Sequence, residues 1–309
     1  MTERNLRVKG LRLRVREVGD GPPILLVNGI GAHVEMWRPL ERALSNRRVV
    51  SFDAPGTGAS QTPPYPLTMG ALAALVEELA DRLELDRVDL VGYSFGGALA
   101  QALALRAPDR VRRLVLAATF PGWGGVPGRL APMLAMATPL RYWSRHFYEA
   151  TAATVAGGRT RQDAEYVRRL WNDRAGHPPG PVGYAQQMWA LGGWSSLPSL
   201  GRLQAPTLIL TGDDDPLVPL GNAMLMASRI PTARVLVAPG DGHFMLLDDG
   251  GRGARAVREF LSAEQLDDAQ VWREAVEVDG AQARARVRAD GPGAFPWGAV
   301  SALCRQVFT

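Results

Sequence analysis

The sequence contains one cysteine, Cys304, and one lysine, Lys9, among its 309 residues. A single cysteine cannot form an intramolecular disulfide, so nothing points to an oxidising compartment. The pI is about 9.6, yet the formal net charge is only +4 and almost all of the positive charge belongs to arginine. The high pI reflects the high pKa of arginine side chains rather than a dense basic patch. We therefore predict no nucleic-acid partner.

The sequence also lacks a long hydrophobic run. No stretch reaches the roughly 18 to 20 apolar residues that a membrane-spanning helix needs. The first ten residues carry charges where a signal peptide would need an apolar region. We therefore predict no membrane span and a cytoplasmic location, and the chain is long enough to bury a sizeable core.

Short apolar runs that end at Gly, Pro or Asp alternate with helical periodicity through the first 250 residues. Buried parallel strands have this appearance. The alternating segment 11–18 suits an antiparallel edge hairpin. The pattern predicts an α/β fold with a doubly wound, mostly parallel sheet, whose further strands are expected at 24–27, 49–52, 88–91, 114–117, 208–210 and 235–237.

The regular alternation breaks between Phe120 and Pro198, where short helices are predicted at 130–137, 140–148, 164–171 and 184–191. We interpret residues 120–198 as a helical lid inserted after the sixth strand. Residues 1–119 and 199–263 then form the core, and residues 264–309 are a C-terminal extension without an assigned role. A hairpin and helix docked on the core, or a surface appendage, are both open for this extension.

The lid segment holds five of the eight tryptophans. We expect about half of its large aromatic and methionine side chains to form the lid's own core, because aromatic residues dominate small cores. The others are expected to line an acyl-binding cleft. The predicted substrate-binding residues are Trp123, Met188, Trp189 and Trp194.

The strongest motif is Gly92-Tyr93-Ser94-Phe95-Gly96, which follows an apolar strand and leads directly into an apolar helix. This is the pattern of a nucleophile elbow, a tight and strained turn with serine at its tip. Small residues are needed two positions before and after the serine, where a side chain would strike the neighbouring strand and helix. We predict that Ser94 is a nucleophile.

A serine hydroxyl needs a base, and in this fold the base is a histidine that follows the last strand, in the chain order Ser, acid, His. Of the four histidines, only His243 follows a late strand. The acid comes after the strand near 208–210. Asp215 is the preferred candidate, Asp213 and Asp214 are expected to cap the following turn or helix, and Asp241 is a weak rival.

Two backbone N–H groups must stabilise the oxyanion. One is expected from Phe95, directly after the nucleophile, and the other from the turn 28–31, at Ile30. Asn28 stands where many such enzymes carry histidine, which leaves the setting of the second donor open. Asp53, in the glycine-rich turn 53–58, is interpreted as scaffold. This chemistry calls for no cofactor and no metal ion.

The segments NGIGA, FDAPGTGAS, GYSFGGALAQ, LVLAAT and GDDDPLVPL together resemble the intracellular poly(3-hydroxyalkanoate) depolymerases of the α/β hydrolases, especially those acting on medium-chain polyesters. The resemblance covers roughly residues 20–262 and includes the end of the lid; the earlier lid and the C-terminal extension depart from the family pattern. It implies hydrolysis of an aliphatic polyester or its oligomers through an acyl-enzyme carried by Ser94, His243 and Asp215, and association with storage granules.

Other functions of the same fold remain open: a general carboxylesterase, a lactonase or a carbon-carbon bond hydrolase. Ser94 argues against a haloalkane dehalogenase, which needs a carboxylate at that position. A hydrolase-fold protein that only binds its ligand is the alternative from a different class. Chain-length preference and oligomeric state do not follow from the sequence.

Overall fold

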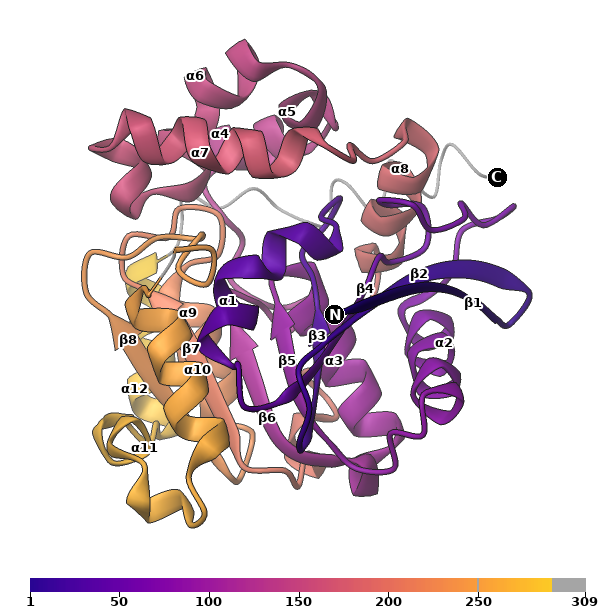
Figure 1. The fold of residues 1–309 in the computed structure, drawn as a ribbon. Helices are drawn as coiled ribbons and strands as arrows, with labels where there is room; N and C mark the ends of the chain where they lie inside the picture. The colour runs from indigo at the N-terminus through magenta and orange to yellow at the C-terminus, as the bar shows by residue number, and fades with distance from the viewer. Residues whose placement is uncertain (249, 291–309) are drawn as a thin grey trace.

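A computed structural model describes residues 1–248 and 250–290 and has an eight-stranded sheet at its centre (Figure 1). The strand order is β1-β2-β4-β3-β5-β6-β7-β8. β1 and β2 form an antiparallel hairpin and β2 is antiparallel to β4, whereas all pairs from β4 to β8 are parallel. The predicted α/β fold and edge hairpin are confirmed. The strands are β1 Thr2–Val8, β2 Leu11–Val18, β3 Pro23–Val27, β4 Arg48–Phe52, β5 Val88–Tyr93, β6 Val111–Ala117, β7 Thr207–Gly212 and β8 Ala233–Ala238.

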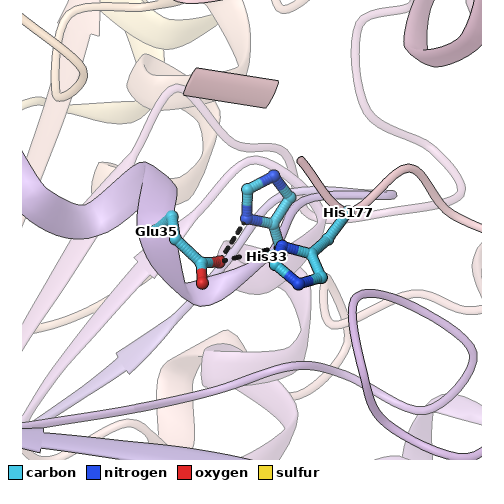
Figure 2. A group of neighbouring side chains, drawn as sticks. All are labelled: His33, Glu35 and His177. Carbon is cyan, nitrogen blue, oxygen red and sulfur yellow. Dashed lines mark hydrogen bonds and ion pairs between the residues drawn. The ribbon is translucent and has the colours of Figure 1, made fainter. Parts of the chain in front are cut away.

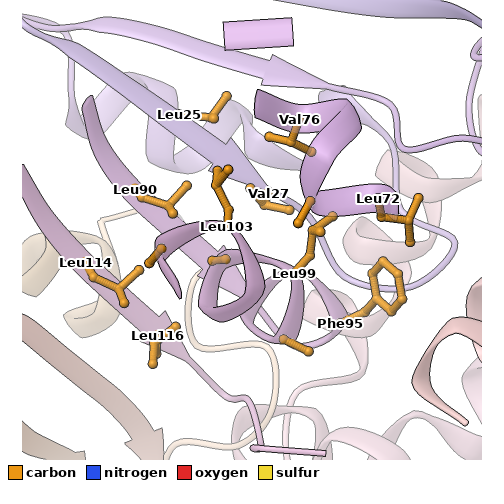
Figure 3. Close-up of a cluster of buried hydrophobic side chains, with 14 of the residues drawn as sticks. Leu25, Val27, Leu72, Val76, Leu90, Phe95, Leu99, Leu103, Leu114 and Leu116 are labelled. Carbon is orange, nitrogen blue, oxygen red and sulfur yellow. The ribbon is translucent and has the colours of Figure 1, made fainter. Parts of the chain in front are cut away.

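The helices of the core cover both faces of the sheet, with α2 and α3 on one face and α1 and α10 on the other (Figure 1). Successive side chains of a strand point to opposite faces, so Leu25 and Val27 enter one buried cluster and Ile24 and Leu26 the other. Figure 3 shows the first cluster, where β3, β5 and β6 pack against α2 and α3. The core helices are α1 Arg38–Ala43, α2 Met69–Arg82, α3 Phe95–Arg106, α9 Leu220–Ala227 and α10 Arg252–Ser262.

The helical segment that we interpret as a lid, and call the lid below, lies between β6 and β7 in the chain and over the carboxyl edge of the sheet (Figure 1). Its helices are α4 Leu130–Met136, α5 Leu140–Trp143, α6 Arg145–Ala156, α7 Ala164–Ala175 and α8 Pro181–Leu191. The single helix expected at 140–148 is wrong. Ser144 is extended there and its hydroxyl accepts a hydrogen bond from the Phe147 N–H, so it ends α5 and caps α6.

Buried aromatic residues of the lid are mostly tyrosines. Trp171 and Trp194 pack partly against the two core clusters, whereas Trp123, Trp143 and Trp189 are 42–46% exposed. The tyrosines that are almost completely buried are Tyr142, Tyr148, Tyr166 and Tyr184. The lid's interior is therefore more polar than the tryptophan count predicts.

The C-terminal extension docks on the core as far as Asp290. α11 Gln270–Glu274 places Trp272 in a stack on Phe260 of α10, with ring centroids 5.3 Å apart. Val276 bridges to Val235 of the edge strand β8, and α12 Gly280–Asp290 packs against α9. Within residues 264–290 the extension forms helices and one bridge rather than a hairpin, and the alternating arginine segment is helical because arginine and alanine both favour helix. Cys304 and the apolar end at 303–308 lie outside the described residues.

In the ranges that the structure describes, none of the helices combines the length and the hydropathy that a bilayer span requires.

Candidate active site

The turn after β5 holds Ser94 in a backbone conformation that few side chains adopt. Its φ is 54° and its ψ is −120°, and such strain is typical of a nucleophile elbow. A Cβ on Gly96 would lie 2.0 Å from the carbonyl oxygen of Val27, and one on Gly92 would lie 2.5 Å from that of Gly96. The two glycines of the motif are therefore required by close backbone approach, as the sequence predicts.

The three side chains predicted to form a triad meet at the carboxyl edge of the sheet. His243 Nε2 lies 3.1 Å from Ser94 Oγ, and His243 Nδ1 lies 2.8 Å from Asp215 Oδ2. All three side chains are buried, and Ser94 is 7% exposed. This is the order of contacts in which an imidazole can take a proton from a serine hydroxyl while a carboxylate holds its tautomer.

Asp215 is fixed by the turn in which it lies. Its Oδ1 accepts hydrogen bonds from the N–H groups of Leu217 and Val218, both at 2.9 Å, which leaves Oδ2 for the imidazole. Asp213 accepts instead from the Gly240 N–H, in the loop after β8. The expectation that Asp213 and Asp214 cap the following turn is wrong, because Asp215 itself makes those bonds.

Asp214 joins the acid loop to the lid. Its carboxylate accepts from the Gly158 N–H at 2.7 Å and pairs with Arg161. The hydrogen bond from Arg161, partly offset by desolvation, keeps the pKa of Asp214 below its usual value. The Asp241 carboxylate has no hydrogen bond to His243, whose Nδ1 partner is Asp215, and burial raises the pKa of Asp241. Of the four carboxylates near this edge, only Asp215 reaches the imidazole.

A short lid segment, residues 156–158, supports the loop that carries His243. The His243 N–H donates to the carbonyl of Ala156 at 2.7 Å. A Cβ on Gly157 would lie 1.8 Å from the carbonyl oxygen of Asp214, and one on Gly158 would lie 2.3 Å from the Gly242 nitrogen. Sequence reasoning missed this segment; the paired glycines after α6 were its only signal, and they resemble an ordinary helix end.

The turn after β3 is shaped by Asn28. Its side-chain amide donates to the carbonyl of His33 at 3.0 Å, and its Oδ1 accepts from the Gly29 N–H at 2.9 Å. Gly29 lies beside the elbow: a Cβ there would lie 3.2 Å from the Tyr93 ring and in ordinary contact with Ser94 Cβ, at 3.5 Å. The N–H groups of Ile30 and Phe95, the two predicted oxyanion donors, have no acceptor within the described ranges. Asn28 thus organises the turn that presents one of these donors.

Two side chains of the lid form hydrogen bonds with the same turn after β3. The hydroxyl of Tyr142 in α5 donates to the carbonyl of Ile30, and the side chain of Gln187 in α8 accepts from the Gly31 N–H at 2.9 Å. A Cβ on Gly31, whose φ is +68°, would lie 2.9 Å from the Tyr142 ring. Two lid helices therefore set the position of the Ile30 peptide.

Asp53 has the scaffold position that its turn predicts. Its two carboxylate oxygens accept from the N–H groups of Val34 and Ala59, both at 2.8 Å. Burial raises its pKa, against the effect of these hydrogen bonds and of nearby Arg14. Asp53 thereby ties the turn after β4 to the segment that follows the turn after β3.

His33, Glu35 and His177 form a second polar cluster between that segment and the lid (Figure 2). His33 Nδ1 lies 2.6 Å from Glu35 Oε2, and His33 Nε2 lies 3.2 Å from the carbonyl of Arg174 in α7. Both partners are acceptors, so both bonds form together only when each ring nitrogen carries a proton. The side-chain types could ligate a metal ion, with ligand atoms within 4.8 Å of one another.

Glu35 in this cluster already has a cationic partner. Arg14 donates to both of its carboxylate oxygens. Burial alone would raise the pKa of Glu35, but hydrogen bonds from His33 and Arg14 outweigh it and hold the pKa well below its usual range. A metal ion would have to compete with Arg14, so the arrangement favours a hydrogen-bonded junction between core and lid.

The predicted substrate-binding residues lie in two environments. Trp194 and Met188 are partly buried against one of the core clusters, and Trp123 and Trp189 are 46% and 42% exposed. The Trp123 N–H donates to the carbonyl of Trp194 at 2.7 Å. Trp194 and Met188 are therefore partly buried against the core, whereas Trp123 and Trp189 are exposed.

Residues 22–250 match the α/β hydrolase fold family. The chain belongs to this family. Among curated relatives, a poly(3-hydroxyalkanoate) depolymerase of Ectopseudomonas oleovorans is 40% identical over 245 residues, which cover 79% of this chain and 85% of the relative. A 2-hydroxy-6-oxo-2,4-heptadienoate hydrolase of Pseudomonas putida is 32% identical over 82% of this chain and 94% of its own length.

Solved structures of this family have the same fold. A meta-cleavage product hydrolase of Pseudomonas fluorescens superposes with a TM-score of 0.71 at 27% identity, covering 84% of this chain and 97% of its own. An enol-lactonase of Burkholderia xenovorans gives 0.72 at 25% identity, covering 84% and 100%. The names of these relatives describe different hydrolase activities, so the bond that this α/β hydrolase cleaves must be argued from its own site.

Proposed function

We propose that this α/β hydrolase cleaves ester bonds through an acyl-enzyme, and that its substrates are poly(3-hydroxyalkanoate) or its oligomers. The observation that carries the ester chemistry is the continuous chain of contacts from Ser94 through His243 to Asp215 at a strained elbow. A hydroxyl becomes a nucleophile when a base within hydrogen-bond reach accepts its proton. The distances support that role for each of the three side chains.

The proposed reaction begins when Ser94 Oγ attacks the ester carbonyl and His243 Nε2 takes the hydroxyl proton. The carbonyl oxygen becomes an oxyanion, to which the N–H groups of Ile30 and Phe95 donate. Collapse breaks the ester C–O bond, the imidazolium protonates the departing alcohol, and the acyl group stays on Ser94. Water then repeats the sequence with His243 as base and releases the acid. Asp215 accepts from His243 Nδ1 throughout and stabilises the imidazolium.

Support for a polyester substrate comes from the depolymerase relative at 40% identity and from the surface of the lid. Among the described residues, seven of the ten exposed large hydrophobic side chains lie between positions 123 and 189. They are Trp123, Leu130, Leu134, Leu140, Trp143, Val182 and Trp189. A concentration of exposed apolar side chains on one segment is typical of an interaction surface, and a polyester granule in the cytoplasm is the surface that we propose.

In this proposal residues 120–198 act as a lid that moves. Ser94 is 7% exposed, so a polymer strand reaches its hydroxyl only after the lid is displaced. Contact of the exposed lid side chains with an apolar granule would favour that displacement, because the apolar surface leaves water in the process. Trp194 and Met188, which are partly buried against the core, are the side chains that we propose to contact the acyl chain.

A substrate panel tests the proposal. Purified protein is assayed on granules, on 3-hydroxyacyl oligoesters with about six to ten carbons per unit, on short p-nitrophenyl esters, on lactones and on a carbon-carbon bond substrate. We expect the highest kcat/KM for the 3-hydroxyacyl oligoesters. Equal or higher values for the short esters would indicate a general esterase, and turnover confined to the carbon-carbon substrate would favour the activity named for the heptadienoate hydrolase relative.

A further inference from the structure

Two arginines of the lid, Arg141 in α5 and Arg174 in α7, are buried without a carboxylate partner in the part of the chain that the structure describes. Each side chain is 2% exposed. Among the described residues, the Nε of each has no hydrogen-bond acceptor, and the Arg141 side chain donates to the sulfur of Met136, a weak acceptor. Buried charges in proteins are normally paired, so this pair calls for an explanation.

The two guanidinium groups share the same three aromatic neighbours. The Arg174 guanidinium carbon lies 4.4 Å from the ring centroid of Phe244, and that of Arg141 lies 5.6 Å from it. Both also lie over the rings of Tyr148 and Tyr142, at 5.2–5.9 Å. These cation–π contacts stabilise the charges in part. They leave the Nε–H group of each arginine without an acceptor among the described residues, and they keep two like charges close together.

Two phenol groups in the same region are unpaired as well. The hydroxyls of Tyr148 and Tyr93 are buried and have no hydrogen-bond partner among residues 1–248 and 250–290. Burial raises the pKa of both above the usual value, against the lowering effect of Arg141 and Arg174, so both phenols are neutral donors near pH 7. Tyr93 directly precedes Ser94, and its ring centroid lies 5.4 Å from that of His243.

The position of this cluster relates it to the reaction. Phe244, which both guanidinium groups contact, directly follows His243, and the two ring centroids are 6.1 Å apart. Tyr142, a further neighbour of both arginines, donates to the Ile30 carbonyl in the turn that presents an oxyanion donor. A ligand among these groups would therefore lie beside the imidazole, under the lid.

We propose that Arg141 and Arg174, with the hydroxyls of Tyr93 and Tyr148, form a subsite for a carboxylate of the substrate. The proposal rests on the proposed function and specifies it: the preferred oligoester has a free carboxyl end, and the lid closes over that end. A carboxylate presents two oxygens in a plane, which matches the fork of a guanidinium group. It would also supply the negative charge that the closed lid lacks.

A consequence is that the ligand helps to close the lid. Without an anion, closure buries four polar side chains that each have an unpaired donor, and two of them carry like charges; both effects are unfavourable. With a carboxylate in place, the same closure forms charge-assisted hydrogen bonds. Binding of the free acid should therefore stabilise the whole protein, whereas a neutral analogue of the same shape should not.

The first test compares two substrates of wild-type protein. One is the 3-hydroxyoctanoate dimer with a free carboxyl end, and the other is the same dimer capped as its methyl ester, with cleavage of the internal ester measured by chromatography. We expect kcat/KM to be at least about tenfold higher for the free acid, the effect of hydrogen bonds to a charged group. A ratio near one in the wild type would overturn the proposal.

Variants then assign the preference to the arginines. Arg141→Gln and Arg174→Gln should bring the ratio of the two kcat/KM values toward one. The control is Arg145→Gln in α6, because Arg145 is exposed and pairs with Glu149 one turn away, and this variant should keep the wild-type ratio. Folded Arg141→Gln and Arg174→Gln proteins that both retain the preference would contradict the assignment.

A binding measurement separates this proposal from the proposed function and does not depend on the arginine variants folding. Ser94→Ala protein is heated with 3-hydroxyoctanoate, with 3-hydroxyoctanamide or with inorganic phosphate at equal ionic strength. We expect only the carboxylate to raise Tm. If the carboxylate raises Tm but the wild-type protein hydrolyses no ester, the subsite is supported and the proposed function is refuted. Equal effects of the carboxylate and the amide, or of the carboxylate and phosphate, would refute the carboxylate subsite.

Discussion

The triad and the arginine cluster under the lid are buried to similar extents, yet their polar groups are satisfied to very different degrees. Around the triad, both oxygens of Asp215 and both ring nitrogens of His243 have partners. Around Arg141 and Arg174, several donors face no acceptor among the described residues. In our proposals, the triad is complete before the substrate arrives, whereas the carboxylate subsite is completed by the substrate itself.

The two regions also differ in the contacts that hold their residues in place. The triad residues lie on turns at the end of a close-packed sheet, where Gly92, Gly96 and Gly157 leave no space for a side chain. The arginine cluster lies between lid helices and the core, held by ring contacts and a few hydrogen bonds. Changes at the triad should therefore affect chemistry first, and changes at the lid should affect binding and stability.

The largest effect is expected from Ser94→Ala. Removing the hydroxyl leaves the oxyanion donors and the binding contacts but no covalent path, so kcat for ester hydrolysis should fall by about 10⁴ to 10⁶. The circular dichroism spectrum and Tm should remain close to those of the wild type, because the substitution removes only one hydroxyl group and keeps Cβ in place. If a folded variant retains most of its p-nitrophenyl ester activity, Ser94 is not the nucleophile. The contrast between a catalytic triad and a separate arginine cluster would then no longer hold.

Asp215→Asn comes next. The amide cannot stabilise the imidazolium and can force the wrong tautomer, so we expect kcat to fall by about 10⁴. Asp213→Asn and Asp214→Asn are matched controls in the same loop, and each should lose less than about tenfold because its bonds reach the Gly240 and Gly158 backbone instead of the imidazole. The opposite ranking would assign the acid to a different carboxylate.

Gly157→Ala tests whether the lid supports the triad. Its φ is +62°, and the new Cβ would meet the Asp214 carbonyl oxygen at 1.8 Å. We expect a loss of about 2 to 4 kcal/mol in the free energy of unfolding, together with a lower kcat, since the strain falls on the loops of Asp215 and His243. Denaturant unfolding and ester kinetics measure both.

The matched control for that variant is Gly176→Ala. Gly176 also follows a lid helix, but its φ is −66° and a Cβ there would meet no atom within 4 Å. Its substitution should change the free energy of unfolding by about 0.5 kcal/mol or less. If both variants behave alike, the segment 156–158 has no special part in positioning the triad.

The smallest effect concerns the junction of His33, Glu35 and His177. Because the pKa of Glu35 is lowered in the folded protein from an ordinary 4.5, its contribution to stability is present above that ordinary pKa and is lost as the pH falls below it. Glu35→Gln should reduce the free energy of unfolding at pH 7 by about 1 to 3 kcal/mol and should weaken the loss of stability on acidification below about pH 4.5. The exposed Glu165 of α7 provides a Glu→Gln control.

Unfolding curves at several pH values would decide this last prediction. A Glu35→Gln protein whose stability falls with acid as steeply as the wild type would show that the carboxylate is not linked to folding in the way its contacts imply. The same variant should leave the ratio of free-acid to capped substrate unchanged, since Glu35 contacts neither guanidinium group of the arginine cluster.

Sequence reasoning was most successful where a motif follows from backbone geometry. The elbow and the order Ser94, Asp215, His243 predict three side chains at one edge of the sheet, and the structure brings them there. The helix boundary at Ser144 and the bonds of Asp213 and Asp214 were predicted wrongly, because a serine or an aspartate can cap a local turn or reach a distant loop with equal chemical ease.

The amino-acid sequence by itself determined the strand periodicity, the glycines at the elbow and the chain order of the triad, because these depend on contacts within a few residues or on rules that every such sheet obeys. Only the tertiary structure decided that Arg141 and Arg174 share one aromatic enclosure beside Phe244, and that Ala156 supports His243. The physical reason is distance along the chain. Whether a charge is paired, stacked or left without a partner depends on residues dozens of positions away, and a local sequence pattern does not predict which of them will be in contact.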